Sequence, residues 1–415
     1  METNVVDMNL TELAKCVLKK RSEISESWIR AKMEEGCDCT QLFEANAGRL
    51  EIYCAPFPFV HDVPVQVFYI LLFGALIFCS IAGNLTVVWI VLRHERMRTV
   101  TNYYLLNLAI SDLAMTILNT GFSGMYNLYY NWIFSDVHCA INNLMGICLV
   151  CASVFTMIVM SIDRYLAIVY PLRRRPGKGA TVTIIICIWV LSVCCGLPAL
   201  AGTKIETHWF IEESENGTKI LKDRLCLADK FPDGNSETSF IFNVYNHTLI
   251  IMQYLVPLII LSFTYGRVAC VLRQNNVIGD TRHTESIRAK KKAANMLALV
   301  VFTFIILWLP YNLYFLFLNN YLQTKLDTKT VLYLYINIYC LGMSSCLLNP
   351  VIYYFMNERF RLGFRYAFRW LPCIHIKREE YESVFSSASR ASHLASRFTI
   401  YSTHQKSGDQ SPIPL

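Results

Sequence analysis

The sequence predicts an all-α membrane protein: a seven-transmembrane helix bundle with a short amphipathic cytoplasmic helix after the last span. Three observations support this fold class. The 415 residues are 54% hydrophobic and only 17% charged, whereas soluble proteins average about 25% charged residues. The apolar residues gather in seven long blocks, and lysine and arginine gather in alternate connections between those blocks.

Each block is long enough to cross about 30 Å of hydrocarbon as a helix. Six blocks contain no charged residue, and the second contains one acid, Asp112. The predicted spans are residues 67–92, 99–126, 139–162, 180–203, 240–266, 293–322 and 330–357. We therefore expect an extracellular N-terminal tail (1–63), a seven-transmembrane domain (64–356), an amphipathic juxtamembrane helix (357–373) and a disordered cytoplasmic tail (374–415).

Positive residues in short loops stay on the cytoplasmic side of a membrane. Lysine and arginine are abundant after the first, third and fifth spans, whereas residues 127–138 contain none and residues 204–239 hold more acids than bases. The expected orientation is therefore N-terminus outside and C-terminus inside. No cleavable signal peptide is expected, because polar sequence follows Met1.

The cysteines outside the spans agree with this orientation. Cys139 and Cys226 both fall on the outer, oxidising side, so we expect a disulfide between them. Cys16, Cys37, Cys39 and Cys54 allow three pairings within the N-terminal tail, and the sequence does not choose among them. The outer sequons Asn9-Leu-Thr and Asn216-Gly-Thr are expected glycosylation sites.

Polar residues inside the spans are candidates for function because they are expensive in hydrocarbon. Asp112 is the only carboxylate in the seven blocks. Ser153, Ser345 and Asn349 stand at similar depth on other spans, and Ser345 and Asn349 share one helix face. These residues could join helices by hydrogen bonds, or their oxygens could hold a sodium ion.

Prolines inside the spans predict kinks, since proline lacks an N–H and its ring clashes with the preceding turn. Pro310 follows Trp308 in "FIILWLPYNLYF", and Pro350 lies within "LLNPVIYYF". Pro198 and Pro257 are also inside spans. These kinks suit helices that pivot.

Seven motifs, in chain order, resemble those of rhodopsin-like (class A) G-protein-coupled receptors. The resemblance covers roughly residues 64–375. The matching segments are "GNLTVV", "NLAISDL", "SIDRYLAIVYP", Trp189, Pro257 with Tyr265, "FIILWLP" and "NPVIY". The segments "RMRTVTNYYLLNLAISDL" and "YYFMNERFRLGFRYAF" are similar to the tachykinin branch of neuropeptide receptors, with neuropeptide Y-like and RYamide or luqin receptors next.

The resemblance implies roles for individual residues. It implies a sodium site, a packing switch beneath the ligand pocket, an activation set near the cytoplasmic face, and the outer disulfide. The sodium set is Asp112, Ser153, Ser345 and Asn349; the switch is Val154, Pro257, Phe304, Trp308 and Pro310; the activation set is Asp163, Arg164, Tyr265, Asn349, Pro350 and Tyr353; the disulfide is Cys139–Cys226.

The resemblance also narrows the ligand. Gly146 occupies the position at which amine receptors carry an acid, and Met343 the position at which opsins carry a lysine. The acidic outer segments favour a basic peptide, and tachykinin-type ligands are amidated. A neuropeptide Y, RYamide or luqin-like peptide, a lipid or another small molecule is the alternative. The candidate pocket residues are Tyr311, Asn312, Phe315, Tyr335 and Tyr339.

The cytoplasmic side carries further expected features. The segment "NERFRLGFRYAFRW" alternates phenylalanine with arginine, which predicts an amphipathic helix in the interface, and Cys373 is a palmitoylation candidate. Serines of the tail, including Ser383, are kinase acceptors that would bind arrestin once phosphorylated. The expected partners are a peptide, a heterotrimeric G protein, receptor kinases, arrestin and membrane lipids, with no nucleic acid.

Two other classes of function are disfavoured. A channel or transporter is disfavoured because the spans hold one carboxylate and no inverted repeat; a signalling-inert scaffold is disfavoured because Arg164, Asn349 and Tyr353 are intact. No nucleophile with its base, metal cluster or phosphate loop is evident, so we expect no enzyme activity and no cofactor beyond the sodium ion. Where many relatives carry an acid that clamps Arg164, this chain has Lys290. We therefore expect Asp163 to restrain Arg164.

Overall fold

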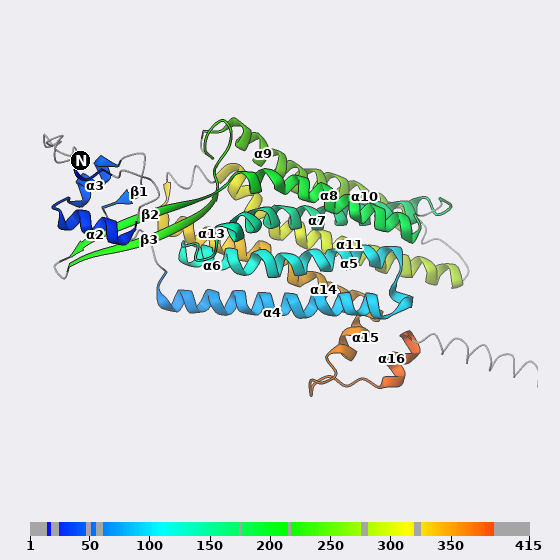
Figure 1. Cartoon of the computed structure of the whole chain (residues 1–415). Helices are drawn as coiled ribbons and strands as arrows, with labels where there is room; N and C mark the ends of the chain where they lie inside the picture. The colour runs from blue at the N-terminus through cyan, green and yellow to red at the C-terminus, as the bar shows by residue number, and fades with distance from the viewer. Residues whose placement is uncertain are drawn as a thin grey trace, which may run out of the picture.

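Within the part of the chain that the structure describes, seven helical segments are long and apolar enough to cross a membrane, and they form one bundle (Figure 1). The structure is a computed structural model that describes residues 15–17, 25–46, 51–54, 61–173, 176–214, 217–236, 238–274, 281–318 and 325–385. The spans are Val63–Arg93, Val100–Tyr129, Asp136–Val169, Lys178–Ala201, Phe240–Val271, Lys291–Leu316 and Lys329–Met356. The predicted seven-helix fold is confirmed.

Several spans are built from more than one helix. The spans consist of α4 (Val63–Arg93); α5 (Val100–Met115), η2 (Thr116–Thr120) and α6 (Gly121–Tyr129); α7 (Asp136–Val169); α8 (Lys178–Ala201); α9 (Phe240–Ile250), η3 (Ile251–Leu255) and α10 (Val256–Gln274); α11 (Thr281–Leu313) and η4 (Tyr314–Leu318); α13 (Thr328–Met343) and α14 (Ser345–Met356). The segments η2, η3 and η4 are π-helical. The short 3₁₀ turn η1 (Glu95–Met97) follows α4.

Polar residues fix where the spans begin. Thr99, Ser135, Ser239 and Asp327 each accept a hydrogen bond from a backbone N–H in the first turn of the helix that follows. Such caps satisfy donors that have no partner within the helix. The apolar runs that follow bury their side chains against each other or face the hydrocarbon.

The expected prolines lie within the bundle. Pro198, Pro310 and Pro350 are inside α8, α11 and α14, and Pro257 is the second residue of α10, directly after the π-helical η3. Ser344 separates α13 from α14, so the seventh span is interrupted before Pro350. The fifth, sixth and seventh spans therefore combine a proline with an irregular segment.

A long β-hairpin projects from one end of the bundle, which we call the hairpin end (Figure 1). Its strands β2 (Thr203–Ser214) and β3 (Gly217–Ala228) are antiparallel throughout. Twelve residues of strand extend about 40 Å. The sequence predicted only a long acidic loop here, so the hairpin is a finding of the structure.

A small N-terminal module covers the outer half of the hairpin (Figure 1). It consists of α2 (Glu26–Glu34), α3 (Cys39–Ala45) and β1 (Glu51–Tyr53), and β1 pairs in parallel with β2. Disulfides Cys16–Cys37 and Cys39–Cys54 select one of the three possible pairings. The module and the hairpin share an apolar core, formed by Cys16, Ile29, Cys37, Cys39, Leu42, Ile52, Trp209, Ile211 and Ile220.

Two short helices lie at the opposite end of the bundle, the α15 end (Figure 1). The helix α15 (Glu358–Ala367) buries Phe360 and Phe364 against the bundle, and it is shorter than the predicted 357–373. The expectation of disorder from residue 374 onward is wrong for α16 (Arg378–Phe385), which packs on the turn after α4. Its apolar Tyr381 and Phe385 are four residues apart, so both reach the same surface.

One contact in particular holds α16. The His94 ring donates from Nδ1 to the Ile90 carbonyl at 2.9 Å and accepts at Nε2 from the Tyr381 hydroxyl. Burial lowers the pKa of His94, which keeps the ring neutral and able to accept. Phe385 packs on the same ring at 4.2 Å between centroids.

The structure predicts that the N-terminal module depends on its disulfides while the bundle does not. Replacing Cys39 and Cys54, separated by 15 residues, with serine should destabilise the module by about 3 kcal/mol. Hydrogen exchange at buried Ile29 and Leu42 should accelerate. Exchange in α7 should not change.

Serine at the exposed free thiols Cys79 and Cys187 is the matched control. An equal loss of protection in α7 would show that the module is required for the bundle to fold.

Candidate functional site

A buried polar network joins the first, second and seventh spans near the middle of the bundle. Asn349 donates to the Asp112 carboxylate at 2.8 Å, and Asn84 donates to the Cys346 carbonyl at 2.9 Å. Ser80 and Thr116 share a hydrogen bond of 2.8 Å. Asp112 is only 4% exposed and forms no ion pair with any residue that the structure describes. Its charge therefore has polar neighbours but no cationic partner among those residues.

Three of the four residues of the expected sodium set, Asp112, Ser153 and Asn349, lie together. Ser153 and Cys346 also interact with the Asp112 carboxylate. Ser345 contacts a different group: its hydroxyl accepts a hydrogen bond of 3.2 Å from the Trp308 indole. A carboxylate with hydroxyl and amide oxygens around it suits a hard cation, so the residues fit the ion expected from the sequence.

Trp308 links this network to the hairpin end of the bundle. Its ring stacks on Phe304 at 5.7 Å and meets Tyr311 edge-on at 5.4 Å. Val154, another member of the expected switch, is almost wholly buried in the same core. A movement of Tyr311 would therefore displace the Trp308 ring. Through the Trp308–Ser345 hydrogen bond it would also disturb the polar network.

A close backbone approach joins the first and seventh spans. A Cβ atom on Gly83 would lie 2.9 Å from Cβ of Pro350. Only glycine permits this contact without a shift of one helix. The approach places Asn84 against the Cys346 carbonyl at the start of α14.

An aromatic cluster fills the hairpin end of the bundle. The ring centroids of Tyr311 and Phe315 lie 4.8 Å apart, and those of Phe315 and Tyr335 lie 6.1 Å apart. The Tyr339 hydroxyl donates to Asn119 at 3.4 Å. Three of the five pocket residues expected from the sequence thus adjoin one another, and Tyr339 lies near Tyr311. Asn312 differs, because its amide donates to the Trp308 carbonyl of its own helix at 2.8 Å.

The structure adds residues that were not predicted from the sequence. Tyr314 packs between Phe315 and Tyr335. Tyr126, from α6, lies near Tyr335. The signal for Tyr314 is its position three residues after Tyr311, on the same helix face. Tyr126 has no comparable signal in the sequence, since its proximity depends on the packing of helices.

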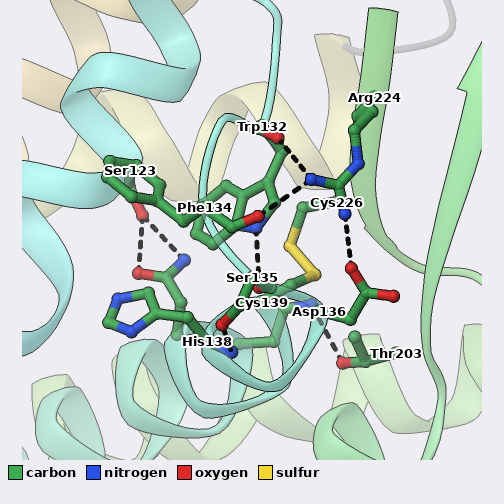
Figure 2. The surroundings of a disulfide bond; sticks show 12 residues. Ser123, Trp132, Phe134, Ser135, Asp136, His138, Cys139, Thr203, Arg224 and Cys226 are labelled. Atoms are coloured by element: carbon green, nitrogen blue, oxygen red, sulfur yellow. Dashed lines mark hydrogen bonds and ion pairs between the residues drawn. A yellow bond between two sulfur atoms is a disulfide. The ribbon is translucent and has the colours of Figure 1, made fainter.

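The outer disulfide anchors the hairpin to the bundle (Figure 2). Cys139 in the first turn of α7 bonds Cys226 on β3, as expected. Arg224 of the same strand donates to Asp136 and, at 3.0 Å, to the Phe134 carbonyl. The buried Trp132 ring packs against this disulfide. The base of the hairpin is therefore fixed at several points.

Arg164 lies toward the α15 end and is restrained as expected. Its guanidinium donates to Asp163 and to the Thr101 hydroxyl. Tyr265 is close enough to interact with Arg164, yet its hydroxyl has no hydrogen-bond partner among the described residues. The buried Tyr353 hydroxyl is equally unpaired within that part of the chain. Arg164 therefore has two hydroxyls within the bundle that it does not engage in this arrangement.

A second restraint joins the sixth span to α15. Lys292 and Glu358 form an ion pair of 2.6 Å. The side chain of Lys290, which the sequence analysis singled out, lies outside the described residues. The Lys292–Glu358 pair was not predicted, because the two residues are 66 positions apart in the chain.

The remaining candidates are modification sites. Cys373 is exposed in the turn between α15 and α16. Asn9 and Asn216 lie outside the described residues.

Comparison with known proteins gives one family match. A sequence model of the family described as "7 transmembrane receptor (rhodopsin family)" matches residues 83–353. The match begins at Gly83 and ends at Tyr353. It therefore contains Asn84, Asp112 and Asn349 of the polar network, Trp308, the outer disulfide and Arg164.

Three relatives illustrate the similarity. The tachykinin-like peptides receptor 99D of Drosophila melanogaster is 35% identical over 336 residues, covering 80% of this chain and 62% of the relative. The tachykinin-like peptides receptor 86C of that organism is 38% identical over 316 residues, covering 75% and 60%. The neuromedin-K receptor of Homo sapiens is 35% identical over 332 residues, covering 80% and 68%. The chain thus spans about three-fifths of the length of the two Drosophila proteins.

The Lys292–Glu358 pair predicts a measurable change in helix position. An exposed ion pair contributes about 0.2–1 kcal/mol to the stability of the arrangement that contains it. Glu358→Lys should therefore move the N-terminal part of α11 away from α15 in a larger share of molecules. Spin labels at exposed Asn295 and Arg361 would report the distance.

The exchanged pair Lys292→Glu with Glu358→Lys should restore the parent distribution. Glu382→Lys, which reverses one charge of an ion pair within α16, is the control. An unrestored distribution in the exchanged pair would contradict the assignment.

Proposed function

The chain belongs to the rhodopsin family of seven-transmembrane receptors, and on this premise we propose that it is a cell-surface receptor for a tachykinin-like neuropeptide that couples to heterotrimeric G proteins. One observation carries the proposal: the aromatic cluster at the hairpin end contacts Trp308, which contacts Ser345 beside the Asp112–Asn349 pair. Packed side chains therefore run from the hairpin end to the polar network in the middle of the bundle.

The proposed mechanism is a shift between two helix arrangements. In the arrangement described, Arg164 is held by Asp163 and Thr101. A ligand that fits the other arrangement better would favour it by the difference in binding free energy. Movement of Tyr311 and Trp308 would pivot the sixth span at Pro310, and Arg164 would then be free to meet Tyr265 and a G protein.

Two positions disfavour an amine or a retinal ligand. A Cβ atom on Gly146 would meet the Asn119 amide at 3.1 Å, so this position has neither an acid nor room for one without a shift. Met343 accepts a hydrogen bond from Thr120 and is buried. A cluster of several aromatic rings beneath a disulfide-anchored hairpin supports a peptide, which can contact more than one of them.

The names of the relatives support the tachykinin branch. Two of the proteins named above are tachykinin-like peptides receptors and one is a neuromedin-K receptor. We therefore place the amidated tachykinin-like peptides ahead of the neuropeptide Y, RYamide and luqin-like ligands that the sequence analysis kept open.

The remaining parts of the proposal concern topology and partners. The hairpin end would be extracellular and the α15 end cytoplasmic in the plasma membrane, with sugars on Asn9 and Asn216. Exposed Cys373 would carry a palmitoyl chain. Receptor kinases and arrestin would act on the serines of the tail.

We also propose that Asp112, Ser153, Ser345 and Asn349 hold a sodium ion. The support is a buried carboxylate without a cationic partner among the described residues. The ion would supply the missing positive charge. It would favour the arrangement in which these side chains are close together.

A panel of amidated neuropeptides, applied to cells that express the chain, tests the main proposal. We expect calcium or cAMP responses to tachykinin-like peptides at nanomolar to micromolar concentrations, lost in Arg164→Ala at equal surface expression. A response to a lipid, with none to any peptide, would overturn the proposal.

The sodium site predicts a difference in stability that requires no agonist. Replacing choline with sodium should raise the melting temperature of the purified chain by a few degrees, because an ion that binds only the folded state stabilises it. Asp112→Asn should abolish this rise.

Ser80→Ala removes a different buried polar contact of the same network and should leave the sodium effect intact. A sodium-dependent rise that survived in Asp112→Asn would place the ion elsewhere.

A further inference from the structure

Asp223 lies on β3 close to the bundle, on the face of the hairpin opposite the apolar core of the N-terminal module; on its own face the Tyr53 ring of β1 packs on His208 at 5.3 Å between centroids. The strand register pairs Asp223 with His208. Alternate residues of a strand point to opposite faces, so Asp223 shares neither the face of Trp209 and Ile211, which pack on the module, nor that of Cys226.

The Asp223 carboxylate is buried, and one of its oxygens has no partner. The residue is 4% exposed, and its Oδ1 atom accepts no hydrogen bond from any residue that the structure describes. Burying such a carboxylate is costly, and burial raises the pKa of Asp223 to about 6 despite the nearby Arg224 N–H. Buried polar groups are nearly always paired, so this exception needs a reason.

The neighbouring basic side chains are occupied elsewhere. Arg224 donates to Asp136 and to the carbonyls of Trp132 and Phe134 (Figure 2). Lys222 lies over the Trp209 ring, on the opposite face. The His208 ring lies 3.7 Å from the Glu206 carboxylate.

The backbone around Asp223 is also held in place. The Trp132 N–H donates to the Arg224 carbonyl at 2.7 Å, and the Arg224 N–H donates to the Asn131 side chain at 3.2 Å. The Cys226–Cys139 disulfide follows three residues later. Rotation of the strand to expose Asp223 to water would break these contacts.

Asp223 is near the aromatic cluster. It lies close enough to Tyr126 to interact with it electrostatically, and Tyr126 in turn lies near Tyr335. A carboxylate beside tyrosine rings is a favourable environment for a guanidinium or ammonium group, which gains both a charged hydrogen bond and contact with the rings.

We propose that Asp223 binds a cationic group of the peptide, an arginine or lysine side chain or the free amino terminus, and thereby selects basic peptides. This inference rests on the proposed function and goes beyond it, since it assigns the specificity for charge to one residue of the hairpin. The cost of burying the carboxylate without a cation is offset only when the ligand is bound.

A role of Asp223 in binding and a role in stabilising the hairpin predict opposite changes in the melting temperature of Asp223→Asn. If Asp223 stabilised the hairpin, Asp223→Asn would lower the melting temperature of the peptide-free chain. A buried carboxylate without a cation predicts the opposite result, because the neutral amide has the same shape and no charge to bury. We expect the melting temperature at pH 7.4 to rise by about 2 °C or more.

The main test is a cycle of paired substitutions. The probe is the most potent amidated peptide found in the panel, with each arginine replaced in turn by citrulline, each lysine by norleucine, and the amino terminus acetylated. Binding is measured to the parent, Asp223→Asn and Glu212→Gln. Glu212 is the matched control, because it lies on the same face of the hairpin, on β2, farther from the bundle.

One of these changes in the peptide should weaken its binding to the parent chain about 10- to 100-fold. The same change should weaken its binding to Asp223→Asn less than about threefold. Glu212→Gln should behave like the parent. Between about pH 7.4 and about pH 5, binding of the unmodified peptide to the parent should fall about 10-fold as Asp223 gains a proton. Asp223→Asn should lack this fall, and His208→Gln should retain it.

Three other outcomes would contradict the role of Asp223. If a peptide binds but every replacement has the same effect on the parent and on Asp223→Asn, the proposed function stands and the role of Asp223 is wrong. A lowered melting temperature in Asp223→Asn would also overturn that role. If no peptide in the panel binds, the proposed function fails and the inference fails with it.

Discussion

The structure depends on how polar groups are satisfied away from water. Hydrocarbon offers no hydrogen bonds, so the backbone of each span must satisfy itself as a helix, and a polar side chain without a protein partner is costly. Asn84, Asn349 and Asp112 find such partners across three spans. These bonds fix which helix faces meet, and Gly83 lets the first span approach Pro350 closely enough for them to form. Apolar packing alone would not select one arrangement, because lipid chains are as apolar as the side chains they replace.

The same constraint explains what could be predicted from the sequence. A span needs about 20 apolar residues, and this signal is strong enough to locate all seven spans. The residues of the polar network are identifiable because polar groups are rare in such blocks. The hairpin was not predicted, although Asn216-Gly217 is a strong hairpin signal, because the dipeptide also forms part of a glycosylation sequon. The α16 helix could not be predicted from the sequence, because it is stabilised by the contact of Tyr381 with His94, 287 residues away in the chain.

The two ends of the bundle are held by different kinds of contact. The hairpin end is held by three disulfides, by β1 pairing with β2 and by the Arg224–Asp136 ion pair. Such a base is stiff, so the residues beneath it are preorganised and lose little conformational entropy on binding. The α15 end contains no disulfide among the described residues, and the ion pair that joins its α15 to the sixth span, Lys292–Glu358, is exposed. Preorganisation is therefore concentrated at the hairpin end, and movement is easiest at the other.

This asymmetry has an energetic consequence for signalling. Arg164 is restrained by a residue of its own helix, Asp163, and by Thr101, and neither contact ties it to the sixth span. The exposed Lys292–Glu358 pair contributes at most about 1 kcal/mol. Converting a population from about 1:99 to about 99:1 requires about 5.5 kcal/mol of differential binding. A peptide that pairs one cation with a buried carboxylate and packs on a few tyrosine rings gains energy of that order. If these contacts form only in the other arrangement, a few of them at the hairpin end are sufficient to change the arrangement at the α15 end.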